Sequence, residues 1–228
     1  VRTALEADLG NPVPSLNLFL ETPEKTFFVS AAADPDKAIT ADTIFRFASN
    51  TKNFTATAIL KMQQDGWLDI TSKVIDAIPG GTMPYVPDGP AWGIPYKDQI
   101  TITMLLNHSA GVFDVSNDAI PGSAETYLDD ILASDPNHQF TATELVGQVT
   151  THNLSYFAPG TGYHYSNTGY TMLGEVIARV YSLRAGVAKT YTDYLEEHIV
   201  GGDSPVVSAM HFAYLGDDQA LPQPACCG

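Results

Sequence analysis

Two short hydrophobic runs near the start of the chain are separated by a polar stretch. Leu16 to Leu20 and Thr26 to Ala33 are rich in aromatic and β-branched residues, and Glu21 to Lys25 between them has the composition of a turn. This pattern predicts an antiparallel β-hairpin. A hairpin without further strands has too few partners for independent stability, so the predicted sheet is incomplete.

Segments with helical periodicity follow the hairpin. The first covers more than one helical face with hydrophobic residues and stops at Asp65-Gly66, so it predicts a buried helix with a glycine C-cap. The predicted helices are Ser49 to Gln64, Thr101 to Leu106, one whose core stripe is Tyr170, Leu173, Ile177 and Val180, and Val187 to Ile199.

Two loops rich in proline and glycine interrupt these helices. Ile75 to Asp98 is a long irregular segment, and Phe157 to Gly162 leads directly into Tyr163 to Asn167. Loops of this kind often carry function in compact domains. The order of elements predicts three parts: a hairpin part (1–48), a nucleophile helix with a helical subdomain (49–200), and a segment leading to a C-terminal part that this chain lacks (201–228).

Composition excludes several classes of protein. The 228 residues carry 11 Lys and Arg against 26 Asp and Glu, which gives a net charge of −15 and no basic cluster for a nucleic acid. Hydrophobic residues make up 44% of the chain, but no run is long enough to cross a membrane. We therefore expect a globular protein that is neither disordered nor bound to nucleic acid.

The residues at the two ends of the sequence are relevant to the cellular location of the protein. Cys226 and Cys227 are adjacent, and neighbouring cysteines rarely bridge each other without strain, so we expect them to pair with a segment absent from this chain. No charged and apolar leader precedes Val1. The acidic surface suits a secreted or salt-tolerant protein. We expect a secreted or periplasmic location, with any export signal already removed or never included in this sequence.

A Ser-x-x-Lys motif stands at the start of the first predicted helix. Ser49 and Lys52 are three residues apart, so their side chains share one helical face and the amine can reach the hydroxyl. This is suitable geometry for an activated nucleophile. The alternative is a helix N-cap at Ser49 beside a solvated lysine.

A Tyr-x-Asn motif, Tyr165-Ser166-Asn167, follows the second glycine- and proline-rich loop. Each motif occurs readily by chance, but their joint presence in this order and in fitting contexts is more specific. The alternative assigns Tyr165 and Asn167 to packing and capping. His108 lies in a glycine-containing turn and is interpreted as structural. His152, His164 and His198 have no partner at metal-ligand spacing, so no metal site is predicted.

With these motifs the chain resembles the penicillin-recognising serine hydrolases, in particular the branch of class C β-lactamases, serine D-alanyl-D-alanine carboxypeptidases, D-aminopeptidases and related esterases. Class A enzymes carry Ser-Asp-Asn in place of Tyr-x-Asn. The sequence segments that carry the resemblance are Phe45 to Lys52, Asp65 to Asp69, Ile100 to Gly111, Phe157 to Gly160 and Tyr163 to Asn167. The resemblance implies an α/β (α+β) fold with an antiparallel sheet flanked by helices, a mostly helical subdomain, and no cofactor.

The resemblance also implies the roles of four residues. Ser49 would attack a carbonyl to form an acyl-enzyme, with its backbone N–H as one half of an oxyanion hole. Lys52 and Tyr165 would move the serine proton, and which of them is the acylation base stays open. Asn167 would orient Lys52 and bind the substrate amide.

The family's third motif, Lys-Thr-Gly or His-x-Gly, is absent, because Lys189-Thr190 is followed by Tyr191. We therefore expect a companion C-terminal segment or chain that carries it.

The predicted function is hydrolysis of amide bonds in D-amino-acid peptides, as by D,D-carboxypeptidases or D-aminopeptidases, or in β-lactams. The expected partner is a small peptide or β-lactam substrate. An esterase of the same family, or a non-catalytic ligand-binding protein if the third motif is truly missing, are the alternatives.

Overall fold

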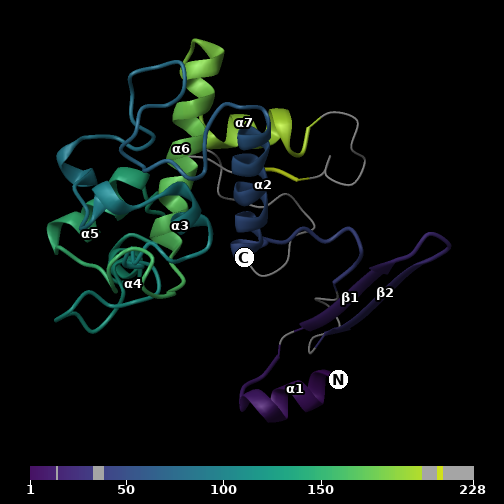
Figure 1. The fold of residues 1–228 in the computed structure, drawn as a ribbon. Helices are drawn as coiled ribbons and strands as arrows, with labels where there is room; N and C mark the ends of the chain where they lie inside the picture. Colours follow the sequence, from purple (N-terminus) through teal and green to yellow (C-terminus); the bar gives the residue numbers. More distant parts are fainter. Residues whose placement is uncertain (14, 33–38, 202–209, 213–228) are drawn as a thin grey trace. The chain divides into compact units, whose positions relative to one another are not determined.

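The computed structural model describes residues 1–13, 15–32, 39–201 and 210–212 (Figure 1). The chain divides into two compact units, one that holds residues 1–47 and one that begins at Ala48. Most of the predicted C-terminal part 201–228, including Cys226 and Cys227, lies outside the described residues. The three-part division of the sequence stays a prediction.

The first unit contains the predicted hairpin. Strand β1 (Ser15–Glu21) pairs antiparallel with β2 (Thr26–Ala32), and helix α1 (Arg2–Leu9) precedes them. The turn is closed by Thr22, whose amide donates to the Lys25 carbonyl at 2.8 Å and whose hydroxyl accepts from the Lys25 amide at 3.0 Å. The hairpin prediction is confirmed, whereas α1 was not predicted.

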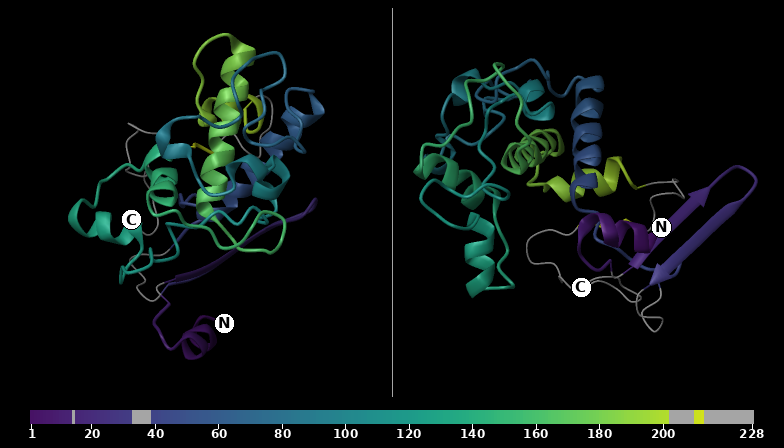
Figure 2. Two further views of the ribbon diagram at one scale, coloured as in Figure 1. Left: turned by 60° about the vertical axis from the view of Figure 1, so that its left-hand side comes forward. Right: turned by 90° about the horizontal axis from the view of Figure 1, so that it is seen from below.

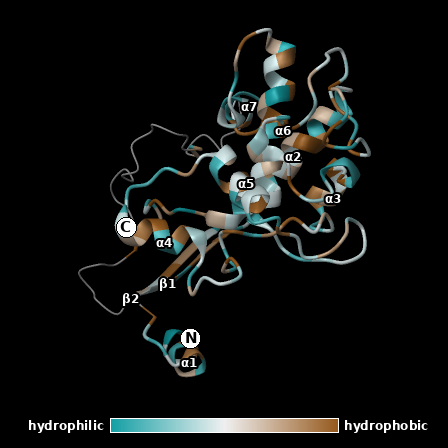
Figure 3. Ribbon diagram, turned by 90° about the vertical axis from the view of Figure 1, so that its left-hand side faces the viewer, coloured by the Kyte–Doolittle hydropathy of each residue, from teal (hydrophilic) through white to brown (hydrophobic). Residues whose placement is uncertain are grey.

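Hydrophobic residues occur along the strands of the hairpin (Figure 3). Several of their side chains are exposed. Within the described residues the sheet has two strands, so both of its edges are unpaired. The exposed set contains residues of both strands, namely Leu18, Phe19, Leu20, Phe27 and Val29. The expectation of an incomplete sheet is therefore confirmed for the part of the chain that the structure describes.

The second unit is helical. Short 3-10 turns at Ala48–Asn50, Pro90–Trp92 and Lys97–Gln99 accompany its helices. The helices are α2 (Thr51–Gln64), α3 (Ile102–Leu106), α4 (Tyr127–Ser134), α5 (Ala142–Thr151), α6 (Asn167–Ala185) and α7 (Tyr191–His198). An antiparallel two-stranded sheet together with these helices confirms the predicted fold class. In the described residues, no helix combines the length and the hydrophobicity that crossing a membrane requires.

Local capping sets the helix ends. Helix α2 ends at Gln64 with Asp65 as its C-cap residue, and Gly66 adopts the left-handed φ of +70° that the predicted glycine stop requires. Helix α7 begins at Tyr191, later than the predicted Val187, because the Thr190 hydroxyl and the Asp193 carboxylate form a capping box at that point. The predicted start of this helix was therefore wrong.

Helices α4 and α5 were not predicted, although their caps are visible in the sequence. Thr126 accepts a hydrogen bond from the amide of Asp129, and Thr141 forms a capping box with Glu144. A Thr-x-x-Asp or Thr-x-x-Glu spacing before an apolar run is the signal that would have found both helices.

Helices α2, α6 and α7 pack together, as the two views of Figure 2 show. The core stripe of α6 is confirmed at Leu173, Ile177 and Val180, which are buried, while Tyr170 is half-buried. The expectation that α2 is buried on more than one face was wrong for the described structure. Its buried residues are Thr55, Ala58, Ile59 and Met62, which form one face toward α6 and α7.

Two adjacent residues of α2 test this packing. Ile59 is 0% exposed and Leu60 is 53% exposed. We expect Ile59→Ala to lower the free energy of unfolding by about 2–5 kcal/mol because it leaves a cavity, and Leu60→Ala to change it by less than about 0.5 kcal/mol. Urea denaturation of both variants measures the difference. A large loss in Leu60→Ala would show that further polypeptide covers this face.

Candidate active site

The start of α2 presents Ser49 and Lys52 to each other. The Lys52 ammonium donates to Ser49 Oγ at 3.3 Å. Ser49 lies in the 3-10 turn before α2, directly after Ala48, whose φ of +43° is left-handed. This conformation costs a residue with a Cβ atom about 1–2 kcal/mol, so the backbone before Ser49 is strained. Such strain is common beside functional groups.

The start of α6 supplies the other two predicted residues. Ser49 Oγ and the Tyr165 hydroxyl share a hydrogen bond of 2.7 Å, and Lys52 Nζ donates to Asn167 Oδ1 at 2.6 Å. The two motifs are separated by more than 100 residues in the sequence. The fold therefore brings all four predicted site residues into one cluster.

The surroundings of Lys52 fix the orientation of Asn167. A lysine ammonium has donors and no acceptor, so the amide oxygen of Asn167 must face it, and Nδ2 points elsewhere. The ring faces of Tyr165 and Tyr170 also lie near Lys52 Nζ, with centroids at 4.6 and 5.4 Å. Lys52 is half-buried among these groups and is not a solvated surface residue.

The capping interpretations are not supported by these contacts. The N-cap residue of α2 is Asn50, and the hydroxyl of Ser49 instead bonds to Tyr165 and Lys52. At α6 the cap is Ser166, whose Oγ accepts from the amide of Gly169 at 2.9 Å. Ser166 therefore caps the helix while its two neighbours in the Tyr-x-Asn motif face α2.

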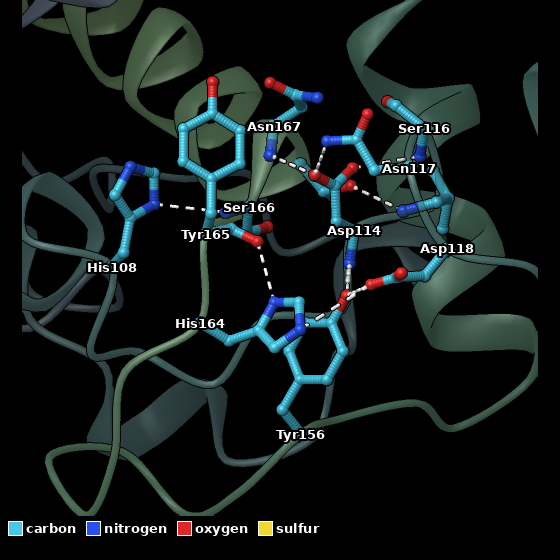
Figure 4. Close-up of polar contacts among 12 residues, drawn as sticks. His108, Asp114, Ser116, Asn117, Asp118, Tyr156, His164, Tyr165, Ser166 and Asn167 are labelled. Carbon is cyan, nitrogen blue, oxygen red and sulfur yellow. Dashed lines mark hydrogen bonds and ion pairs between the residues drawn. The ribbon is translucent and has the colours of Figure 1, made fainter. Parts of the chain in front are cut away.

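His108 contacts this motif from the turn after α3 (Figure 4). Its Nδ1 accepts from the Ser166 amide at 3.1 Å, and its ring lies 4.6 Å from the Tyr165 ring, centroid to centroid. Burial, and then the positive charge of Lys52, lower the pKa of His108, against a smaller opposite effect of Asp114. His108 is thus a neutral acceptor that supports the backbone between Tyr165 and Asn167.

Sequence reasoning missed Asp114, which lies in the loop after α3. Its carboxylate accepts hydrogen bonds from the backbone N–H of Asn167 at 2.9 Å, the Asn117 side chain at 2.7 Å and the backbone N–H of Ser116 at 3.0 Å (Figure 4). The residue is completely buried. No local pattern marks it, because a single aspartate in a loop has the same appearance in a sequence whether it is buried or solvated.

A second group of missed residues supports Tyr165. The Tyr156 hydroxyl donates to Asp118, and the His164 ring stacks on the Tyr156 ring with centroids 3.6 Å apart. His164 Nδ1 lies 2.9 Å from the backbone carbonyl of Tyr165 and donates to it. Burial and the bond to Asp118 raise the pKa of Tyr156, so its hydroxyl stays protonated. The hydrogen bond from His164 therefore holds the backbone carbonyl of Tyr165 in place.

A cavity of about 330 Å³ borders the Lys52–Asn167 pair. Its lining includes Thr55, Tyr191 and the half-buried Glu175, which lies two turns further along α6 than Asn167. Burial raises the pKa of Glu175, while Arg179 acts in the opposite direction. Polar groups thus line space for several waters beside the cluster.

Comparison with known proteins agrees with this geometry. The sequence profile described as Beta-lactamase matches residues 22–201, which is most of the chain and includes both motifs. This chain belongs to the beta-lactamase family. The membership confirms the resemblance to penicillin-recognising serine hydrolases that the motifs indicated.

Similar proteins are found both among curated sequences and among solved structures. Among curated proteins, "Protein flp" of Staphylococcus aureus is 27% identical over 87% of this chain and 35% of its own length, and a penicillin-binding protein of Bacillus subtilis is 27% identical over 72% and 30%. Among solved structures, a D-stereospecific amidohydrolase from Streptomyces has a TM-score of 0.65 at 26% identity, covering 87% of this chain and 52% of its own.

A D-amino acid amidase from Ochrobactrum anthropi is similar at a TM-score of 0.59 and 26% identity, with 87% of this chain and 51% of its own covered. The chain thus spans about a third of the length of the curated relatives and about half of these solved ones. The family match over residues 22–201 includes both motifs, whereas neither Lys-Thr-Gly nor His-x-Gly occurs in this sequence.

The lowered pKa of His108 predicts a pH dependence of stability. Below pH 6.5 the unfolded chain binds a proton at this residue that the folded chain does not, so stability falls as the pH drops from 6.5 to the folded-state pKa. We expect His108→Asn to weaken this dependence. Asparagine tolerates the left-handed φ of +61° at this position and does not titrate.

Thermal denaturation at pH 7.5 and at pH 5.5 measures the effect. The fall in Tm between the two pH values should be smaller in the variant than in the wild type. The other histidines are common to both proteins and cancel in the comparison. An equal fall in both proteins would contradict the assignment of His108 as a buried neutral acceptor.

Proposed function

We propose that this protein is a serine hydrolase that cleaves amide bonds in D-amino-acid peptides or amides, or in β-lactams, through an acyl-enzyme on Ser49. One observation carries the proposal: Ser49 Oγ lies within hydrogen-bonding distance of both Tyr165 and Lys52. Two groups that can accept its proton thus face one nucleophile. The similarity to a D-stereospecific amidohydrolase and to a D-amino acid amidase supports amides as the substrate class.

In the proposed reaction Ser49 Oγ attacks the carbonyl carbon, and its proton passes to the neutral amine form of Lys52 or to the phenolate form of Tyr165. The tetrahedral intermediate then expels the amine, which takes up a proton from the same pair of residues. Water attacks the remaining ester in the second half of the cycle and regenerates Ser49. Both candidate bases touch Ser49 directly, and the choice between them stays open.

Asn167 has two tasks in this proposal. Its Oδ1 accepts from Lys52 and holds the ammonium beside Ser49. Its Nδ2 is then directed away from Lys52 and can donate to the amide carbonyl of a bound substrate. Asn167 therefore links the position of the proton-transferring lysine to the position of the substrate.

The proposal includes groups outside this chain. The backbone N–H of Ser49 would supply one oxyanion donor, and a companion C-terminal segment or chain with the third motif would supply the other. We further propose that the protein is secreted or periplasmic, where D-amino-acid peptides of the peptidoglycan type occur. The fraction of the relatives' length that this chain spans supports a companion segment.

Covalent labelling tests the nucleophile. We expect the full-length protein to gain the mass of one penicillin or fluorophosphonate adduct at Ser49, and Ser49→Ala to gain none. Lys52→Ala and Tyr165→Phe should slow labelling by roughly one-hundredfold to ten-thousandfold, the usual contribution of a positioned acid–base group. Intact mass and peptide mapping measure the adduct.

The matched control is Ser134→Ala, which removes an exposed serine of α4 far along the sequence from both motifs. It should label as the wild type does. A wild-type protein that folds but takes no adduct would favour the alternative of a non-catalytic binding protein.

A substrate panel tests the amide specificity. We expect hydrolysis of a D-amino acid amide or an acyl-D-alanyl-D-alanine peptide, and slower hydrolysis of the L-configured counterpart. An ester of the same D-amino acid serves as the comparison, since esters are chemically easier to cleave. If the protein hydrolyses the ester but none of the amides, the proposed amidase activity is wrong and the esterase alternative is favoured.

A further inference from the structure

The Asp114 carboxylate is 0% exposed, yet the proposed reaction does not use it. Burying a carboxylate is costly unless hydrogen bonds compensate. Three N–H donors do so here, and all three come from the same loop or from the first residue of α6. A group bound in this way must be held in one position.

The bond to the Asn167 amide acts at a helix terminus. The first N–H groups of a helix have no acceptor within the helix, and a negative charge at this end is favourable. Asp114 Oδ2 accepts the N–H of Asn167, while Ser166 Oγ accepts that of Gly169. Asp114 therefore satisfies the backbone of the residue whose side chain holds Lys52.

Two further hydrogen bonds fix the loop that holds Asp114, one to α6 and one to the loop that leads into α6. The Val115 amide donates to Thr168 Oγ1 at 3.3 Å, and the Asp114 amide donates to the Tyr156 hydroxyl at 3.0 Å. In Figure 4 Asp114 lies between the start of α6 and the Tyr156 side chain. The Asp114 carboxylate is thus positioned by contacts with the start of α6 and with Tyr156.

We propose that Asp114 is a positioning residue, which fixes the backbone of Asn167 so that its Oδ1 faces Lys52 and Tyr165 faces Ser49. The inference rests on the proposed function. It extends that function to a residue that touches neither the substrate nor the nucleophile. A displacement of about 1 Å in a catalytic group can cost roughly a hundredfold in rate, which sets the size of the expected effect.

The test compares Asp114→Asn with Asn117→Ala in the full-length protein. Asp114→Asn keeps the shape of the side chain, but its two polar atoms can no longer both accept N–H groups. Asn117→Ala removes another hydrogen bond from the same carboxylate oxygen and leaves the one to Asn167 in place. The readout is the single-turnover rate constant for acylation of Ser49 by a chromogenic β-lactam.

We expect Asp114→Asn to lower this rate constant by about ten- to a hundredfold, and Asn117→Ala to leave it within about threefold. A purely structural role would reduce the amplitude, which reports the folded fraction, without changing the rate constant. An unchanged rate constant in Asp114→Asn, or an equal loss in Asn117→Ala, would overturn the proposal. Asp114→Ser, which is smaller and keeps one acceptor, replaces Asp114→Asn if that variant does not fold.

Failure of the proposed function is recognised separately. If the wild type takes no adduct, the acylation mechanism is wrong, and the side-chain amide signal of Asn167 in a nitrogen–proton NMR spectrum tests Asp114 alone. That signal should move in Asp114→Asn and stay in Asn117→Ala. An unmoved signal in Asp114→Asn would overturn the positioning role.

Discussion

The hydrogen bond between Lys52 and Asn167 joins the starts of α2 and α6, two helices that pack in the core of the second unit. An ammonium taken out of water needs acceptors, and the Asn167 amide oxygen and two tyrosine rings supply them. The ammonium that binds Asn167 also binds Ser49, which lies in the 3-10 turn just before α2. The cluster therefore depends on how α6 begins, which is a matter of backbone hydrogen bonds at Ser166 and Asn167.

Much of this arrangement could be predicted from the sequence where the signal is local. The hairpin, the glycine C-cap of α2 and the stripe of α6 follow from short-range patterns. The two motifs predicted Ser49, Lys52, Tyr165 and Asn167, which the fold brings together, and their catalytic roles stay a prediction. Helices α4 and α5 were missed because their apolar faces are short, although the threonine caps at their starts can be recognised in the sequence. Asp114 could not be found, since its burial arises only when the loop after α3 meets α6.

The hydrophobic residues that are exposed on α2 and on the hairpin share one physical cause. Periodicity shows which positions prefer burial, but it does not identify the partner that buries them. On α2 the described structure covers the face of Ile59 and leaves Leu60 exposed, and on the hairpin Leu18 and Val29 are exposed as well. These side chains have the composition of core residues, and this chain spans about half of the solved relatives. The sequence thus indicated a larger apolar surface than the described residues cover.

The charges are distributed unevenly between the surface and the cluster. The chain has a net charge of −15, yet among the described residues the hydrogen-bond partners of Lys52 are the neutral oxygens of Ser49 and Asn167. A carboxylate in their place would hold the ammonium charge and oppose proton exchange with the nucleophile. The buried carboxylate of Asp114 instead binds the backbone N–H of Asn167, while the side chain of Asn167 binds the lysine. Among the described residues, a buried acid can in this way organise the backbone of the site without forming a hydrogen bond to Lys52.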